Sequence, residues 1–425
     1  MIETQTELAQ AWTEFEAIVG REHLRPASPS DAIDGVQPLG IVAPGTAQEV
    51  AQVLRQCSAA GLAVVPRGGG TKLWLGNRPQ KADLILSTER LNRVLEHAWG
   101  DLTATVEAGC TIGSLQQTLQ EHGQRLAADP LWPEAATVGG ILATAESGTL
   151  RIRYGAIRDL VLGVEMALSD GNVIKAGGKV VKNVAGYDLN KLVIGSLGTL
   201  GVITRAVFRL HSIPAATGSY STALKSASEA NEMVLAILGA PFVYTGLQVR
   251  AQAAGEFAVD VRFEGIPESL EDQSDKLRKV AAGRPFGECP DEVWTKRQKL
   301  FANAGNSVIC KCSVLPAQIG SLCEAVFRQA ESAQAAATLV VQGTGVGEVR
   351  LDGSRQQQLA EVVKALRSEL DRLEGTLVVQ QCPTAMKEGL DVWGTRRDTL
   401  PLMGQIKAKF DPARILNPGR YMGGI

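Results

Sequence analysis

Three glycine-rich segments contain the residues of this chain that are best suited to bind a ligand. They are residues 66–72 (PRGGGTK), residues 137–140 (TVGG) and the stretch from Gly171 to Gly201, which holds seven glycines. Repeated glycine beside strand-like runs indicates left-handed backbone or close approach of main chain to a ligand. In the first segment, successive N–H groups flanked by Arg67 and Lys72 can form an anion-binding turn. One such turn alone is equally consistent with a simple loop, but three segments together favour one extended dinucleotide.

Two common nucleotide motifs do not fit the first segment. A Rossmann fingerprint needs G-x-G-x-x-G after a strand, but Leu73 occupies the third glycine position. A P-loop needs Gly-Lys-Ser/Thr, and residues 70–72 read Gly-Thr-Lys instead. The sequence therefore does not support nicotinamide or nucleoside-triphosphate chemistry.

Composition and charge narrow the class of protein. A chain of 425 residues is too long for one ordinary core, so two domains are expected. A formal net charge of −2 with interspersed charges argues against a nucleic-acid partner. No apolar run is long enough to span a membrane and no secretory signal is recognisable, so we expect a soluble, cytoplasmic protein, peripheral to the membrane only through partner subunits. The seven scattered cysteines show no Cys-x-x-Cys spacing, which argues against an iron–sulfur site in this chain.

Strands and helices that alternate over residues 37–213 predict an α+β domain that positions the glycine segments. Thr46 begins a capping-box pattern ahead of a helix that ends near Gly61, and residues 62–66 read as a buried strand leading into the first glycine segment. Further strands are expected at residues 84–87, 104–107, 161–168, 173–176 and 202–210, with a helix at 112–123. Residues 1–36 read as an N-terminal leading segment without chemistry of its own.

A second domain is expected after Pro214, where glycine becomes less frequent. Strands are predicted at residues 257–263, 306–314, 337–342, 348–352 and 376–381, with a long amphipathic helix at 357–373. This pattern fits a ferredoxin-like α+β cap domain over residues 214–390. Residues 391–425, with a helix near 402–410, are expected to pack back on the first domain.

These motifs carry a family resemblance. The segments concerned are residues 66–72, 129–130, 137–140, 153–155, 158–159, 164–171, 182–189 and 195–203, with 410–412 and 416–420 near the C-terminus. Together they resemble the FAD-binding, PCMH-type domain of the vanillyl-alcohol oxidase family. The resemblance covers roughly residues 40–212 and 390–425 in order. It implies two α+β subdomains that hold FAD between them and a cap domain over the isoalloxazine ring.

The resemblance also implies which residues contact FAD. Residues 67–72 would bind the pyrophosphate, Val202 and Ile203 would lie near the adenine, and Asp129 and Pro130 would lie along the flavin. The full set comprises Pro66, Arg67, Gly68, Gly69, Gly70, Thr71, Lys72, Asp129, Pro130, Thr137, Val138, Gly139, Gly140, Ala143, Ser147, Arg153, Gly155, Asp159, Gly201, Val202, Ile203 and Asn417. Some members attach FAD through a histidine in the first glycine loop. This loop has none, so noncovalent FAD is expected.

Oxidation of a 2-hydroxy acid needs a clamp for the carboxylate, a base for the hydroxyl proton and a flavin to accept hydride. The segment Trp294-Thr-Lys-Arg297 resembles a motif near the active site of related dehydrogenases, which makes Arg297 a candidate clamp. Arg396 or Arg397 is a second possibility, and for each a tryptophan-anchored surface helix is an equally good interpretation. No histidine follows His211, and residues 341–345 offer no metal ligands, so neither a base nor a metal site is identified.

Three functions remain open. Within the family, the chain length, residues 182–192 and the ending at 417–425 most resemble the FAD-binding subunits of bacterial glycolate oxidase (glycolate dehydrogenase) complexes. That resemblance implies a larger flavin subunit and an iron–sulfur subunit as partners, with oxidation of glycolate to glyoxylate shared with or done by the larger subunit. The alternatives are a self-sufficient FAD-dependent dehydrogenase of a small D-2-hydroxy acid such as D-lactate, and a scaffold subunit without a redox role.

Overall fold

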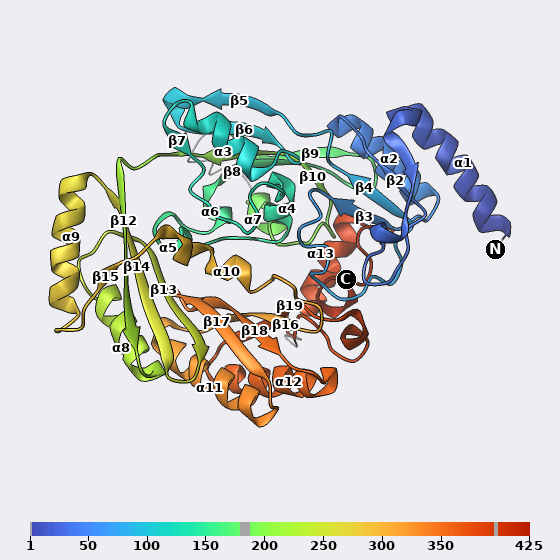
Figure 1. The fold of residues 1–425 in the computed structure, drawn as a ribbon. Helices are drawn as coiled ribbons and strands as arrows, with labels where there is room; N and C mark the ends of the chain where they lie inside the picture. Colours follow the sequence, from blue (N-terminus) through green and yellow to red (C-terminus); the bar gives the residue numbers. More distant parts are fainter. Residues whose placement is uncertain (1, 179–187, 395–397) are drawn as a thin grey trace. The chain divides into compact units, whose positions relative to one another are not determined.

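The computed structural model of the chain describes residues 2–178, 188–394 and 398–425, and their side chains from residue 11 onward. Residues 182–187 of the family resemblance, and both Arg396 and Arg397, lie outside the described residues. The chain divides into two compact units, and each is described by itself (Figure 1). Unit 1 comprises residues 1–147, 156–213 and 395–425, and unit 2 comprises residues 148–155 and 214–394.

The first sheet of unit 1 has four strands in the order β1-β2-β4-β3. Its strands are β1 (Leu24–Pro26), β2 (Gly40–Val42), β3 (Val64–Arg67) and β4 (Leu84–Ser87), and the last three run parallel. Helix α2 (Ala47–Ala59) follows β2, and its cap is Thr46, whose hydroxyl accepts a hydrogen bond from the Glu49 N–H at 3.1 Å. The predicted capped helix and the strand into the glycine loop are both confirmed, although β3 begins two residues later than expected. Helix α1 (Ile2–Val19) packs on α2.

The second sheet of unit 1 has five antiparallel strands in the order β5-β6-β10-β8-β9. They are β5 (Val94–Ala98), β6 (Thr103–Glu107), β8 (Val161–Ala167), β9 (Val173–Gly177) and β10 (Val202–Arg209). Short helices α3 (Ile112–Gln120), α4 (Val138–Ala143), α6 (Ile157–Leu160) and α7 (Leu189–Val193) lie along the chain between these strands, and β7 (Gln124–Arg125) pairs with β11 (His211–Ser212). The predicted strands β6, β8, β9 and β10 are confirmed. The exposed edge strand β5 was not predicted, because a strand with little burial lacks the apolar alternation that marks the others.

Unit 2 contains one eight-stranded sheet built from two βαββαβ halves, which confirms the predicted α+β class and doubles the ferredoxin-like unit. The first half comprises β12 (Ala216–Leu224), α8 (Ala227–Leu238), β13 (Tyr244–Ala253), β14 (Glu256–Gly265), α9 (Pro267–Val280) and β15 (Gly287–Glu288). The second comprises β16 (Val308–Ser313), α11 (Ile319–Ser332), β17 (Ala336–Gln342), β18 (Val346–Asp352), α12 (Gln356–Arg372) and β19 (Thr376–Gln381). The strand order β15-β12-β14-β13-β17-β18-β16-β19 shows that the halves meet where β13 pairs with β17.

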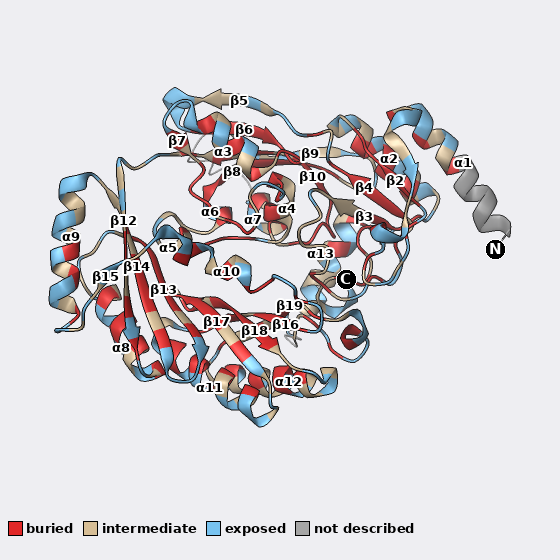
Figure 2. Cartoon of the chain, in the orientation of Figure 1, coloured by how far each residue is buried: buried red, intermediate tan, exposed pale blue. Residues whose placement is uncertain are grey.

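The two faces of this sheet differ in chemistry. Leu247, Val249 and Val259 belong to an apolar core that also includes residues of α8, α11 and α12. Because successive strand residues point to opposite faces, the neighbouring Gln248 and Asp260 point to the other face, and both are almost fully buried. Figure 2 shows the strands largely buried and the outer sides of the helices exposed. Because Gln248 and Asp260 are buried on this second face, their polar groups need hydrogen-bond partners within the protein.

The segment after residue 398 completes unit 1. Helix α13 (Leu400–Phe410) carries Lys407, whose ammonium group donates to the Thr199 carbonyl at 2.8 Å, the Leu416 carbonyl at 2.8 Å and the Asp411 carboxylate at 2.7 Å. Burial lowers the pKa of Lys407, and the nearby Asp411 carboxylate opposes that shift. Asp411 in turn accepts hydrogen bonds from the N–H groups of Ile415 and Leu416. One buried ion pair therefore ties the end of α13 to the turn that carries Thr199.

We expect Lys407→Met to destabilise unit 1 strongly, because it leaves the Asp411 carboxylate buried without its charged partner. Breaking a buried pair from one side typically costs about 3–5 kcal/mol of unfolding free energy. Thermal unfolding with and without FAD measures the effect. The exposed Lys409 on the same helix supplies the matched control, since Lys409→Met makes the same change at the surface. Equal melting temperatures for the two variants would contradict the assignment.

Candidate cofactor site

A groove in unit 1 brings the three predicted glycine segments together. Its lining comprises residues 66–73, 136–137, 140–141, 143–144 and 197–198, with Leu131, Glu146, Asn417 and Arg420. An adjoining pocket shares residues 66–68, 140, 143 and 198 with the groove and extends it to Thr88, Gly139 and residues 201–203. Every one of these residues belongs to unit 1. The two cavities therefore adjoin each other, and their shared lining comes from the end of β3, the first glycine segment, α4 and Gly198.

The first glycine segment presents unpaired N–H groups to this groove. Strand β3 ends at Arg67, and within the described part of the chain none of the N–H groups of residues 68–71 donates to a backbone acceptor. Gly70 adopts a φ of +71°, in the left-handed region that favours glycine. Successive free N–H groups in such a turn form an anion-binding concavity. This geometry fits a pyrophosphate.

The second glycine segment has a different role. Thr137 is the N-cap of α4, and its hydroxyl accepts a hydrogen bond from the Gly140 N–H at 3.2 Å. The N–H groups of Val138 and Gly139 donate to the carbonyls of Cys110 and Ala108 at 2.9 and 2.7 Å. Because these donors already have protein partners, the start of α4 shapes the wall of the groove and offers it no free N–H at these three positions.

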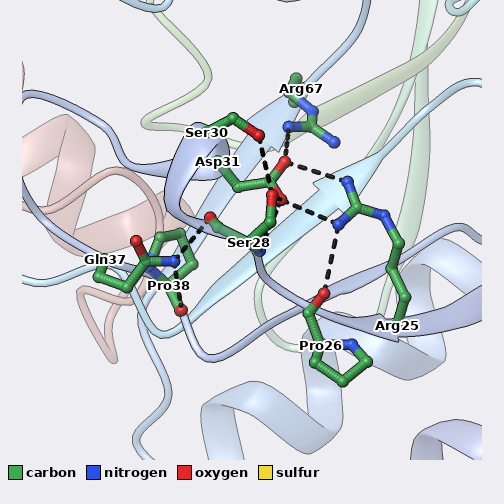
Figure 3. Close-up of polar contacts among 8 residues, drawn as sticks. All are labelled: Arg25, Pro26, Ser28, Ser30, Asp31, Gln37, Pro38 and Arg67. Carbon is green, nitrogen blue, oxygen red and sulfur yellow. Dashed lines mark hydrogen bonds and ion pairs between the residues drawn. The ribbon is translucent and has the colours of Figure 1, made fainter.

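The positive charge beside the loop is held by Asp31 (Figure 3). The buried Asp31 carboxylate accepts hydrogen bonds from Arg67 Nη1 at 2.8 Å, from Arg25 Nη1 at 2.8 Å and from the Ser28 N–H at 2.9 Å. These hydrogen bonds, that of Arg25 first, hold the pKa of Asp31 far below its ordinary value although burial acts in the opposite direction. Asp31 therefore stays ionised and fixes the guanidinium of Arg67 at the groove.

The sequence-based prediction that residues 1–36 carry no chemistry overlooks Asp31, which pairs with Arg67 at the groove. Asp31 closes the short 3₁₀ helix Pro29–Asp31, so its local sequence looks like an ordinary turn with a cap. The signal that distinguishes it is the contact with Arg67, 36 positions later, and a contact of that range is not visible in local sequence.

Residues from the C-terminal segment hold both walls of the groove. The buried Arg420 donates from Nη2 to the carbonyls of Leu73 and Leu75 at 2.5 and 2.6 Å. Burial lowers the pKa of Arg420 to about 10, so its guanidinium stays charged at neutral pH. Asn417 donates from Nδ2 to the Leu197 carbonyl at 2.6 Å. Across the groove, Lys72 forms a buried ion pair with Glu146.

The structure places most predicted cofactor residues at this groove and several away from it. Residues that line the groove or its extension are Pro66, Arg67, Gly68, Gly69, Gly70, Thr71, Lys72, Thr137, Gly139, Gly140, Ala143, Gly201, Val202, Ile203 and Asn417. Residues outside that lining are Asp129, Pro130, Val138, Ser147, Arg153, Gly155 and Asp159. Ser147 accepts a hydrogen bond from the Ile157 N–H and Asp159 from the Ala156 N–H, so both organise the start of α6. Arg153 and Gly155 cluster with unit 2.

The glycines of the groove serve two different purposes. Gly69 and Gly139 are both among the predicted FAD contacts, but a Cβ on Gly69 would lie 1.7 Å from the Ala135 carbonyl oxygen, and one on Gly139 would lie 2.9 Å from the Ala108 Cβ. Both glycines are therefore required by protein packing. A Cβ on Gly140 would meet only the Thr137 hydroxyl, at 3.1 Å, among protein atoms within 4 Å. Gly140 lines both cavities, so its missing side chain leaves room for a ligand.

The candidate clamp Arg297 lies in unit 2 and is only 6% exposed. It belongs to α10 (Lys296–Lys299), and its Nη1 lies 3.4 Å from Oε1 of the buried Glu348. An arginine that is buried and paired in this way is better placed to stabilise the polar face of the sheet than to receive a substrate carboxylate. Arg396 and Arg397, the second possibility, lie outside the described residues.

His97 and His211 lie outside the lining of the groove and its extension. His97 is hydrogen-bonded to Gln124 at 3.0 Å. The pKa of His211 is lowered, mainly by burial and also by the positive charge of the nearby Arg209. In the described ranges no three His, Cys, Asp or Glu side chains gather to form a metal site. No helix among the described residues is both long and apolar enough to cross a membrane.

Comparisons with known proteins agree with this groove. Residues 38–177 match the family described as "FAD binding domain". The chain is 27% identical over 433 residues to glycolate oxidase subunit GlcD of Bacillus subtilis (strain 168), covering 90% of this chain and 88% of that protein. It is 27% identical over 430 residues to D-2-hydroxyglutarate dehydrogenase of Xanthomonas citri pv. viticola, with coverages of 90% and 89%. It is 39% identical to D-lactate dehydrogenase of Archaeoglobus fulgidus over 170 residues, which are 40% of this chain and 38% of that protein.

Solved structures extend the likeness of the fold to the whole chain. A substrate-bound p-cresol methylhydroxylase superposes with a TM-score of 0.78 at 17% identity, covering 98% of this chain and 97% of that chain. An alkyldihydroxyacetonephosphate synthase gives 0.75 at 18% identity, with coverages of 97% and 86%. The chain is a flavoprotein with a PCMH-type FAD-binding domain. More specifically, it is an FAD-dependent oxidoreductase that is similar over about nine-tenths of its length to proteins named as a glycolate oxidase subunit, a D-2-hydroxyglutarate dehydrogenase and a D-lactate dehydrogenase.

We expect Asp31→Asn to weaken FAD binding about tenfold, because the neutral amide no longer fixes the charge of Arg67 beside the pyrophosphate, and one charge-assisted contact is typically worth about 1.4 kcal/mol or more. Quenching of flavin fluorescence on titration of the apoprotein measures the dissociation constant. Since the folded-state pKa of Asp31 is lowered, its contribution is complete above the ordinary value of 3.8 and is lost only as the pH falls through the lower folded-state pKa. The exposed Asp101→Asn is the control, and equal affinities for both variants would contradict the role of Asp31.

Gly140→Val should leave the fold intact but weaken FAD binding at least tenfold, because its side chain enters the groove without meeting protein backbone. Gly69→Val should instead prevent folding, since even a Cβ collides with the Ala135 carbonyl. Melting temperature and flavin content of the purified variants separate the two effects. Gly100→Val is the matched control because nothing lies within 4 Å of a Cβ there. Normal flavin content in Gly140→Val would show that this position does not face the cofactor.

Proposed function

We propose that this chain is the FAD-binding subunit, of the GlcE type, of a glycolate dehydrogenase complex that oxidises glycolate to glyoxylate. A larger flavin subunit would perform or share the oxidation, and an iron–sulfur subunit would receive the electrons. The complex would be cytoplasmic, with any membrane association supplied by the partner subunits. The observation that carries the subunit assignment is the buried ion pair between Arg297 and Glu348. Arg297 is the arginine of the segment 294–297 that resembles the dehydrogenase motif, and its pairing with Glu348 leaves it poorly placed to bind a substrate carboxylate.

The class of substrate is supported by the named relatives. Glycolate, D-lactate and D-2-hydroxyglutarate each carry a hydroxyl group on the carbon next to a carboxylate, and proteins named for all three match this chain. The choice of glycolate rests on the resemblance of the chain's ending at residues 417–425 to glycolate oxidase subunits. A 2-hydroxy acid is therefore the supported class, and glycolate is the proposed member.

The groove supports a role in holding FAD. The flavin supplies the hydride acceptor for 2-hydroxy-acid oxidation. This chain's own contribution is to bind the pyrophosphate with the N–H groups of residues 68–71, to place the positive charge of Arg67 beside it and to keep space open at Gly140. No histidine lies in residues 66–73, which favours noncovalent attachment.

A self-sufficient D-2-hydroxy-acid dehydrogenase is the second candidate. It is favoured by the 39% identity to the archaeal D-lactate dehydrogenase, although that match covers only 40% of this chain. It requires a base, and unit 2 carries no histidine after residue 213. The scaffold alternative is weakened by the groove itself, because free N–H groups in a partly buried loop are costly unless a ligand or solvent satisfies them.

We expect the purified chain alone not to oxidise glycolate or D-lactate at a useful rate, because a positioned base commonly contributes about 10² to 10⁴ in rate. Dye reduction with each substrate measures turnover, and co-expression with a larger flavin subunit and an iron–sulfur subunit should restore it. The double variant Arg297→Met, Glu348→Gln removes the pair without leaving a buried charge, and the complex should keep its activity within about threefold. Loss of activity at unchanged flavin content would favour the self-sufficient enzyme, as would rapid flavin reduction by glycolate in the isolated chain.

A further inference from the structure

The two ferredoxin-like halves of unit 2 differ at their fourth strand. In the second half, β19 pairs with β16 from Thr376 to Gln381. In the first half, β15 has two residues, and its strand pairing among the described residues is with Tyr220 and Ser221 of β12. Because β12 extends from residue 216 to 224, the outer edge of its first four residues has no neighbouring strand among the described residues.

A proline ends the short strand. The Cys289 N–H donates to the Ser219 carbonyl at 2.9 Å, and Pro290, which has no N–H, follows and caps the 3₁₀ helix Asp291–Thr295. Alternate residues of an antiparallel strand face the same edge, so Thr217 presents its N–H and carbonyl in the same direction as Ser219. Within the described part of the chain, neither group of Thr217 has a hydrogen-bond partner on that edge. An unpaired edge of this kind is a template for another strand.

A groove of about 740 Å³ lies along this free edge. One side is the start of β12, from Ala216 to Tyr220, and the other is a single face of α9. In Figure 1, α9 stands beside β12 and β15 at the margin of the unit. The residues of α9 that line the groove are Pro267, Leu270, Glu271, Ser274, Asp275 and Arg278, which follow helical spacing. The groove therefore occupies the position that a longer fourth strand would fill.

The charges of the groove select its occupant. Exposed carboxylates line it at Glu271, Asp275, Glu288 and Asp291, against one guanidinium, that of Arg278. Arg278 is already paired with Asp275 at 2.5 Å. The surface is thus acidic on both sides of the free edge, and complementary charge favours lysine and arginine in an incoming segment.

We propose that the edge of β12 binds an extended, basic segment of another polypeptide, which adds to the sheet as a strand. Main-chain hydrogen bonds to Thr217 would supply affinity, and the flanking carboxylates would select lysine or arginine at alternate positions. This inference goes beyond the proposed function, because the interaction needs neither FAD nor substrate.

The test uses the full FAD-loaded chain and three fluorescein-labelled, acetylated octapeptides. One alternates lysine and valine, one alternates glutamate and valine, and one alternates lysine and proline, which cannot pair as a strand. Fluorescence anisotropy should show the lysine–valine peptide binding at least tenfold more tightly than either of the others. Hydrogen exchange should slow in residues 216–219 on binding.

Two variants locate the interaction. Thr217→Pro removes the free edge N–H, and the double variant Glu271→Lys, Glu288→Lys reverses the charge; each should weaken binding at least tenfold. Glu268→Lys, on α9 but outside the groove, should not. Absence of binding, equal binding of the lysine and glutamate peptides, or full binding by both variants at unchanged melting temperature would overturn the proposal. A concentration-dependent dimer that Thr217→Pro abolishes would also overturn it, by assigning the edge to a second copy of the chain.

Discussion

The N–H groups of residues 68–71, which have no backbone acceptor among the residues that the structure describes, are the constraint on which the rest of unit 1 depends. A loop that keeps its donors free for a ligand cannot stabilise itself by its own hydrogen bonds, so it has to be held from outside. Asp31 fixes Arg67 at the start of the loop. Arg420 holds the end of the loop by donating hydrogen bonds to the carbonyls of Leu73 and Leu75. Both contacts use a buried charge, and both come from segments distant in sequence. The binding surface is therefore preorganised by contacts that do not themselves bind the ligand.

Unit 2 obeys the opposite constraint. Its sheet has one face suited to an apolar core, while the other face carries buried charges that have to satisfy one another. Asp260 accepts from Arg250 and Gln248, and Arg297 pairs with Glu348. These pairings lower the free-energy cost of burying the charges, but they also leave the charged groups less available to a ligand. A face whose charged groups are already paired with one another is poorly suited to bind a charged substrate.

Local patterns in the sequence predicted the elements that are locally determined. The capping box at Thr46, the strand into the glycine loop and the amphipathic helix α12 each have a short-range signature, and the structure confirms them. Strands β12 and β13 were missed. The sequence of β12 combines glycine and serine with few large apolar residues, so it lacks the pattern typical of a strand. The family resemblance located the glycine segments of the groove. It could not reveal that Gly69 faces Ala135, since that contact depends on a turn 66 residues away along the chain. Asp31 was missed for the same reason: the sequence near it describes a turn, and its function lies in a distant partner.

The contacts from Lys407 and Arg420 also impose an order in time. Arg420 bonds to the Leu73 carbonyl across 347 positions, so the ribosome has to make that much chain after the glycine loop before the loop is held. At roughly 5–20 residues per second, this takes roughly 20 to 70 seconds. During that interval Asp31 can already pair with Arg67 at the start of the loop, whereas the contacts from Arg420 at its end are still missing. The full set of contacts around the groove therefore forms only after unit 2 has been synthesised, and a chain interrupted before Lys407 would lack both the Lys407 ion pair and the Arg420 hydrogen bonds.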